Sequence, residues 1–151
     1  MARTRIVHLA AMIGVLLMAL PLSAQRSQTA KETKVDVLKQ KLDKREKILL
    51  IDVCDEDEVK SGSIPGSVNL PMNQLQARMK DIPKGVQIVF LCDHGNRSSL
   101  AAELFEKNGY KAATFCALED WKAKGYKIGE SKKPGPKTIR PWPCGTGPSP
   151  C

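Results

Sequence analysis

A cysteine at position 92 begins a short polar loop between two stretches whose apolar patterns are typical of regular secondary structure. The apolar run from Val86 to Leu91 predicts a buried strand, and the apolar positions between Leu100 and Lys107 predict a helix. The first N–H groups of a helix lack partners within it, and the helix dipole favours negative charge there. A thiol at this place is therefore expected to ionise readily, and the thiolate is the nucleophilic form of cysteine. The alternative is a cysteine that is merely buried at the end of a strand.

The residues that follow Cys92 favour a tight turn around its sulfur. Gly95 can adopt a positive φ, and Ser98 or Ser99 can cap the helix. His94 and Arg97 are the cationic side chains of the loop. The candidate site therefore comprises Cys92, Asp93, His94, Gly95, Asn96, Arg97 and Ser98.

A second apolar run, Ile48 to Val53, predicts another strand that is buried on both faces, as in a parallel sheet. Asp52 interrupts this run, and a carboxylate there is costly unless it is paired or accepts hydrogen bonds. Two interpretations remain open. Asp52 either supports the loop at Cys92 or caps the turn that follows its own strand.

Helices and strands alternate through the rest of the domain. Asp55 to Glu58 is typical of the acidic first turn of a helix. The alternation predicts a three-layer α/β domain with a mostly parallel sheet, in which ligands bind beyond the carboxyl ends of the strands. Cys92 is placed at such an end. The remaining helices are expected at 35–42, 72–80 and 118–124, and the remaining strands at 67–71 and 112–116.

The two ends of the chain differ from its middle. Arg3 and Arg5 precede an apolar stretch that ends in small residues before Gln25, which predicts a signal peptide over residues 1–24 and export to the periplasm or the exterior. An uncleaved membrane anchor is the alternative; once the signal is removed, we expect no contact with a membrane. We divide the rest into a lead-in (25–32), one domain (33–128) and a Pro- and Gly-rich tail (129–151) that is disordered or loosely docked.

Composition narrows the classes of partner. The net charge is +8, but aromatic residues make up only 5% of the chain and the charges are scattered, so no nucleic-acid partner is expected. The positive net charge supports the more modest inference of an electrostatic field that attracts small anions. Five cysteines leave at least one unpaired in an exported protein, and Cys144 and Cys151 can close a small ring across a flexible spacer. We expect no metal and no other cofactor.

Several separated motifs, in this order and at this spacing, resemble those of a rhodanese domain. The resemblance covers about residues 33–128 and is strongest to small single-domain thiosulfate sulfurtransferases. It implies a five-stranded parallel sheet between helices, with the active loop at the end of the central strand. The motifs are Leu50-Ile51-Asp52-Val53, Glu58, Gly62, Ile64-Pro65-Gly66, Asn69-Leu70-Pro71, Cys92-x-x-Gly95-x-Arg97-Ser98, and Trp121 with Gly125-Tyr126.

The resemblance also implies a reaction. The Cys92 thiolate would take the outer sulfur of thiosulfate or of a persulfide, and cyanide or a thiol would then accept that sulfur. The loop amides from Asp93 to Ser98 would stabilise the anionic sulfur. Arg97 would bind the sulfonate end of thiosulfate or pair with Asp52 or Glu58 as support for the loop, and His94 either helps or faces solvent. The expected partners are a small anionic sulfur donor, a thiol or cyanide acceptor, and a thiol redox protein.

The length of the loop separates this chemistry from phosphate chemistry. Four residues lie between Cys92 and Arg97, whereas related cell-cycle dual-specificity phosphatases have five and a wider cradle. The shorter loop disfavours phosphatase and arsenate reductase activity. Asp93 is discordant, because its charge beside the nucleophile repels thiosulfate by about 1 kcal/mol if exposed. A neutral or protein-bound donor would then be preferred.

Cys54 stands where the family usually has arginine after Asp-Val. If its strand neighbours the central one, the two cysteines share one edge of the sheet, where strands are roughly 5 Å apart. Cys54 is then a candidate resolving thiol for Cys92, with inert burial as the alternative. Two functions besides an enzyme remain open: a sulfur carrier or binding module without turnover, and a thiol redox protein that uses Cys54, Cys92 and the tail pair.

Overall fold

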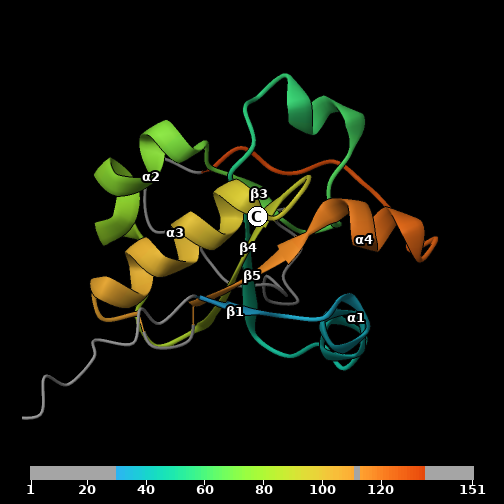
Figure 1. The fold of residues 1–151 in the computed structure, drawn as a ribbon, viewed down its shortest axis with the longest axis horizontal. Helices are drawn as coiled ribbons and strands as arrows, with labels where there is room; N and C mark the ends of the chain where they lie inside the picture. The colour runs from blue at the N-terminus through green and yellow to red at the C-terminus, as the bar shows by residue number, and fades with distance from the viewer. Residues whose placement is uncertain (1–29, 111–112, 135–151) are drawn as a thin grey trace, which may run out of the picture.

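A parallel sheet of five strands forms the centre of the computed structural model, which describes residues 30–110 and 113–134 (Figure 1). The strand order is β1-β5-β4-β2-β3, and every neighbouring pair is parallel. Strand β4 is therefore central, and Cys92 is its last residue. The expected sheet, with the loop at the end of its central strand, is confirmed. The strands are β1 (Lys31–Glu32), β2 (Ile48–Asp52), β3 (Val68–Asn69), β4 (Gln87–Cys92) and β5 (Ala113–Ala117).

Helices cover both faces of the sheet, with α2 and α3 on one side and α1 and α4 on the other (Figure 1). This is the three-layer α/β architecture that the alternating elements predict. No helix in the described part of the chain is long and apolar enough to cross a bilayer. The helices are α1 (Val35–Asp43), α2 (Met72–Arg78), α3 (Asn96–Lys107) and α4 (Leu118–Ala123), with 3₁₀ turns η1 (Glu58–Ser61) and η2 (Met79–Asp81).

Side chains of β4 alternate between two apolar layers, because successive residues of a strand point to opposite faces. Phe90 and Cys92 belong to the cluster beneath α2 and α3, where Phe90 meets the ring of Phe105 edge-on at 4.8 Å. Val89 and Leu91 belong to the cluster beneath α1 and α4. The sulfur of Cys92 is therefore directed to the side of the sheet that carries α3.

The beginning of the domain differs from expectation in two places. Lys31 and Glu32, assigned to an untethered lead-in, form the edge strand β1 against Thr114 and Phe115. Edge pairing uses backbone groups, so a charged dipeptide carries no hydrophobic signal for it. The acidic residues before Glu58 do not start an α-helix. They lead into the 3₁₀ turn η1, which is capped at its C-terminus by Gly62 with a φ of 106°.

The start of the proposed tail is docked on the sheet. Ser63 and Gly129 exchange backbone hydrogen bonds of 2.8 and 2.9 Å, and Lys132 bridges to Val68 of β3. Regular backbone pairing therefore extends at least to Lys132. The predicted signal peptide (1–24) and the Cys144–Cys151 ring lie outside the described residues.

Candidate functional site

The thiol of Cys92 lies at the N-terminus of α3, as the sequence predicts. Its sulfur is 3.3 Å from the backbone nitrogen of Ser98, which donates to it, and the thiol donates to Ser98 Oγ, also at 3.3 Å. Only 2% of the Cys92 surface is exposed. An N–H in the first turn of a helix that points at sulfur stabilises negative charge on that sulfur.

Gly95 brings the loop into contact with the neighbouring strand. Its φ is 83°, in the left-handed region, and a Cβ there would lie 3.5 Å from the ring of Phe115 and 3.7 Å from Ala117. Glycine adopts this conformation at little cost. The helix begins at Asn96, so Ser98 and Ser99 lie within its first turn and donate to carbonyls, at 3.1 Å to Gly95 and 2.8 Å to Asn96. The expectation that a serine caps this helix is therefore wrong.

The guanidinium group of Arg97 is paired with the carboxylate of Glu58. Its two terminal nitrogens donate to both carboxylate oxygens of Glu58, at 2.6 and 2.8 Å. A bidentate pair of this kind fixes the geometry of both partners. Of the acids considered for Arg97, the structure selects Glu58 and not Asp52. Glu58 thereby ties η1 to the loop that carries Cys92.

The Arg97–Glu58 pair shifts the pKa of each partner so that the charged form of both side chains is favoured. Hydrogen bonds from Arg97, and then one from the backbone N–H of Asp55, lower the pKa of Glu58 from 4.5 to about 2. The hydrogen bond to Glu58 raises the pKa of Arg97 above its usual value. Glu58 is therefore a support for the loop and remains ionised at neutral pH.

A pH-dependent stability follows from Glu58. Because its folded pKa is below its unfolded value, its contribution is complete above about pH 4.5 and is lost as the pH falls toward about 2. We expect Glu58→Gln to reduce the free energy of unfolding at neutral pH by about 1 kcal/mol or less, since the pair is partly exposed. Urea titrations at a series of pH values should show this deficit shrinking in acid.

Glu56→Gln is the matched control, since Glu56 makes an exposed 3.3 Å pair with Lys133. Its deficit should be smaller at neutral pH. A Glu58→Gln deficit that stays constant from neutral pH to about pH 3 contradicts the assignment.

Asp52 is fully buried and holds the segments that flank it in space. One carboxylate oxygen accepts from the backbone N–H of Cys54 at 3.0 Å, and the other accepts from the hydroxyl of Ser63. Ser67 in turn donates to Ser63 at 3.0 Å. Asp52 therefore caps the turn after β2, and its support of the loop at Cys92 is indirect.

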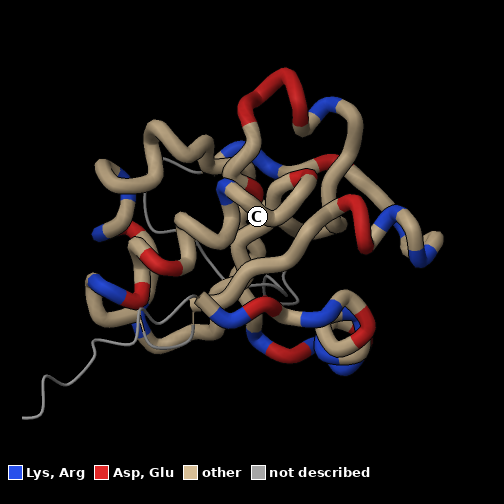
Figure 2. Tube along the Cα trace, in the orientation of Figure 1, with Lys and Arg blue, Asp and Glu red and all other residues tan. Residues whose placement is uncertain are grey.

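The rim of the site carries both signs of charge. Asp93 lies 3.5 Å from the amine of Lys122, and His94 Nδ1 lies 2.7 Å from a carboxylate oxygen of Glu119. Asn96 is exposed at the start of α3. The acidic run that leads into η1 is the red segment at the top of Figure 2. The amine of Lys122 therefore offsets part of the negative charge of Asp93.

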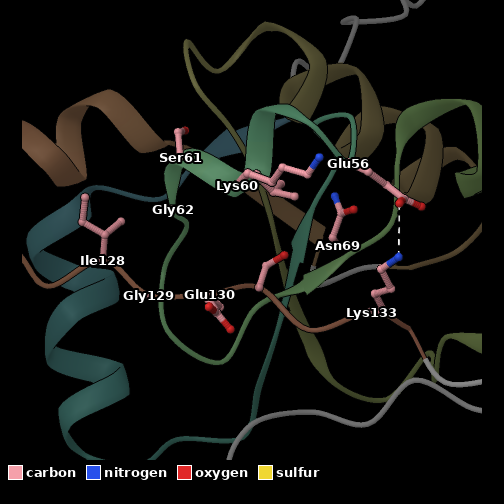
Figure 3. Close-up of a pocket in the computed structure, with 11 residues that line it drawn as sticks. Glu56, Lys60, Ser61, Gly62, Asn69, Ile128, Gly129, Glu130 and Lys133 are labelled. Atoms are coloured by element: carbon pink, nitrogen blue, oxygen red, sulfur yellow. Dashed lines mark hydrogen bonds and ion pairs between the residues drawn. The ribbon is translucent and has the colours of Figure 1, made fainter.

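A cavity of about 550 Å³ lies beside η1, away from the thiol (Figure 3). It lies between η1 and the segment 128–133, and the pair of Glu56 with Lys133 spans one side of it. Cys92 and the loop that follows it do not line this cavity. Within the described residues, no group of three or more His, Cys, Asp or Glu side chains is placed to hold a metal ion.

Comparisons with known proteins agree with this arrangement. The "Putative sulfur carrier protein YrkF" of Bacillus subtilis is 28% identical over 104 residues, which are 68% of this chain and 56% of that protein. A sulfurtransferase of Allochromatium vinosum is 37% identical over 73 residues, covering 48% of this chain and 68% of its own length. The human single-domain sulfurtransferase TSTD1 superposes with a TM-score of 0.56 at 26% identity, covering 63% of this chain and 97% of that chain. The family model described as Rhodanese-like domain matches residues 34–124. This chain therefore belongs to the rhodanese-like family.

Proposed function

We propose that this protein is a sulfurtransferase in which Cys92 carries the transferred sulfur as a persulfide. The observation that supports it most is the Ser98 N–H, 3.3 Å from Cys92 Sγ, at the carboxyl end of the central strand. Membership of the rhodanese-like family and the sulfurtransferase relatives support transfer of sulfur in general. No cofactor is required, because the cysteine itself holds the sulfur between the two half-reactions.

The two half-reactions share one nucleophile. In the first, the Cys92 thiolate attacks the outer sulfur of thiosulfate or of a persulfide; an S–S bond forms, and sulfite or a thiolate leaves with the electrons of the broken bond. In the second, cyanide or a thiol attacks the outer sulfur of the Cys92 persulfide, and the thiolate of Cys92 returns. The N–H of Ser98 stabilises the sulfur charge in both.

The charges around the loop bear on the donor. Glu58 engages both terminal nitrogens of Arg97, so binding a sulfonate there requires sharing or replacing a bidentate partner. Asp93 adds a negative charge that Lys122 only partly offsets. A neutral or protein-bound persulfide therefore suits this rim better than free thiosulfate.

Intact-mass measurement of the full chain after incubation with thiosulfate, and separately with a low-molecular-weight persulfide, tests the proposal. Wild type and Cys116→Ser should each gain about 32 Da, one sulfur atom, and peptide mapping should place the gain on Cys92. Cys116→Ser is the matched control because Cys116 is buried on the opposite face of the sheet. Absence of the gain with both donors in wild type and in Cys54→Ser alike, or a gain that persists in Cys92→Ser, contradicts the proposal.

A sulfur carrier without turnover is the second candidate function. The carrier name of one relative and the near-complete burial of Cys92 favour it. A carrier loads one sulfur and holds it until a partner protein takes it, so excess cyanide and thiosulfate should give stoichiometric and not continuous thiocyanate. A thiol redox role remains the third hypothesis.

Export is part of the proposal as well. The basic start and apolar stretch of residues 1–24 support cleavage before Gln25. N-terminal sequencing of the protein made in a bacterial host and recovered outside the cytoplasm checks this directly.

A further inference from the structure

A second thiol lies next to the first at the same edge of the sheet. The register of β2 with β4 places Asp52 beside Leu91, and Cys54 and Cys92 follow within two residues of that pair. Neighbouring strands are about 5 Å apart, which is within the Cα separations that a disulfide spans. Both cysteines are 2% exposed and belong to the same buried cluster.

The loop that follows Cys92 also contacts Cys54. A terminal nitrogen of Arg97 lies 3.5 Å from the sulfur of Cys54. The backbone N–H of Asp93 also interacts with the Cys54 thiol. The loop therefore contacts the Cys54 sulfur through Arg97 and Asp93, and its Ser98 N–H contacts the Cys92 sulfur.

Cys54 is present as a free thiol with its proton retained. Burial, and then the charge of Asp52, raise the pKa of Cys54, and the Asp93 amide and Arg97 only partly oppose this. In the described part of the chain Cys54, Cys92 and Cys116 are all unpaired. A protonated thiol beside a persulfide holds the proton that a departing sulfide needs.

We propose that Cys54 resolves the Cys92 persulfide, so that the protein releases hydrosulfide and is left with a Cys54–Cys92 disulfide. The proposal rests on the persulfide of the proposed function and adds a second activity to it. The proton of Cys54 passes to the outer sulfur of the persulfide, and Cys54 Sγ attacks Cys92 Sγ. The Cys92 S–S bond breaks, and the outer sulfur leaves as hydrosulfide with the electron pair of that bond.

The electrons of this step balance within the protein. With the outer persulfide sulfur counted as zero-valent, the sulfurs of Cys54 and Cys92 each lose one electron on forming the disulfide, and the outer sulfur gains both and leaves as hydrosulfide. A dithiol reductant, such as a protein of the Cys-X-X-Cys class, returns both cysteines to thiols by disulfide exchange. The inference thus specifies the kind of partner that the sequence suggested only as a thiol redox protein.

The test follows the loaded protein after the donor has been removed by desalting. Mass spectrometry should show the gain of about 32 Da replaced by a loss of about 2 Da relative to the reduced chain, with one sulfide released per chain. Trypsin should then yield the peptides 48–60 and 85–97 joined by a disulfide. The double variant Cys144→Ser/Cys151→Ser removes the tail thiols from the comparison.

Cys54→Ser and Cys116→Ser separate the proposal from its alternatives. In Cys54→Ser the persulfide should still form on Cys92 but should release sulfide at least about tenfold more slowly, whereas Cys116→Ser should behave as wild type. A persulfide on Cys92 that releases sulfide equally fast in wild type and Cys54→Ser, or with no joined peptides, overturns the inference and leaves the proposed function standing. Absence of any persulfide on Cys92 in Cys54→Ser, in which it cannot be resolved, refutes the proposed function itself.

Discussion

Cys92→Ser is expected to reduce the rate of thiocyanate formation from a sulfane-sulfur donor and cyanide by about a thousandfold or more. The hydroxyl of serine does not ionise at neutral pH and does not hold a transferable sulfur, so both half-reactions lose their nucleophile. The measurement is initial rates at saturating donor, with wild type and Cys116→Ser beside it. Because serine is close to cysteine in volume and the Ser98 N–H remains, the fold should persist.

Circular dichroism and urea unfolding of Cys92→Ser provide the control for folding. A variant that folds normally but forms no thiocyanate supports nucleophilic catalysis by Cys92. A variant that keeps more than about a tenth of the wild-type rate excludes it. Wild type that forms a single equivalent of thiocyanate and then stops supports the carrier function.

Asp52→Ala should be the most destabilising single substitution discussed for this domain, with a loss of about 3 kcal/mol in the free energy of unfolding. Asp52 is fully buried, and its removal leaves the Cys54 N–H and the Ser63 hydroxyl without their acceptor. Buried donors without partners cost the full desolvation of each group. Urea unfolding monitored by circular dichroism measures the loss as a lower midpoint.

Asp52→Asn is the matched comparison because its amide oxygen can still accept from Cys54 N–H at 3.0 Å. Its NH₂ group can donate to Ser63 Oγ, so we expect a loss of about 1 kcal/mol. Equal stability of Asp52→Ala and wild type contradicts the capping role. Equal losses in the two variants would assign the effect to charge instead of hydrogen bonding.

The centre of the fold could be predicted from sequence because its signals are dense. Two largely apolar strands and a cysteine–glycine–arginine loop specify a buried parallel sheet and the strand–helix junction at Cys92. The placement of Cys54 near that junction also follows from the strands. The sequence left two acids, Asp52 and Glu58, as candidate partners of Arg97. It does not show that the carboxylate of Asp52 already accepts hydrogen bonds from Cys54 and Ser63.

The outer elements could not be predicted, because backbone pairing leaves little trace in side-chain pattern. Strand β1 consists of Lys31 and Glu32 alone and contains no apolar residue. Gly129 and Lys132 lie in a segment whose proline and glycine content argues against regular structure, and yet Gly129 pairs with Ser63 and Lys132 pairs with Val68 of β3. The start of α3 also differs from the expectation of a serine cap, because Gly95 in the left-handed region precedes the helix.

The pairing at Lys132 sets a limit on how far this protein can be shortened. Asn69 of the outermost strand β3 donates to the Lys132 carbonyl at 2.8 Å, and the Lys132 N–H donates to Ser67 at 2.8 Å. The family match ends earlier, at residue 124. A chain trimmed to that boundary would uncover the rim of β3, and bare strand edges recruit other molecules into oligomers and aggregates. Recombinant versions that stay monodisperse should therefore retain residues through Lys133, with any affinity tag placed after them.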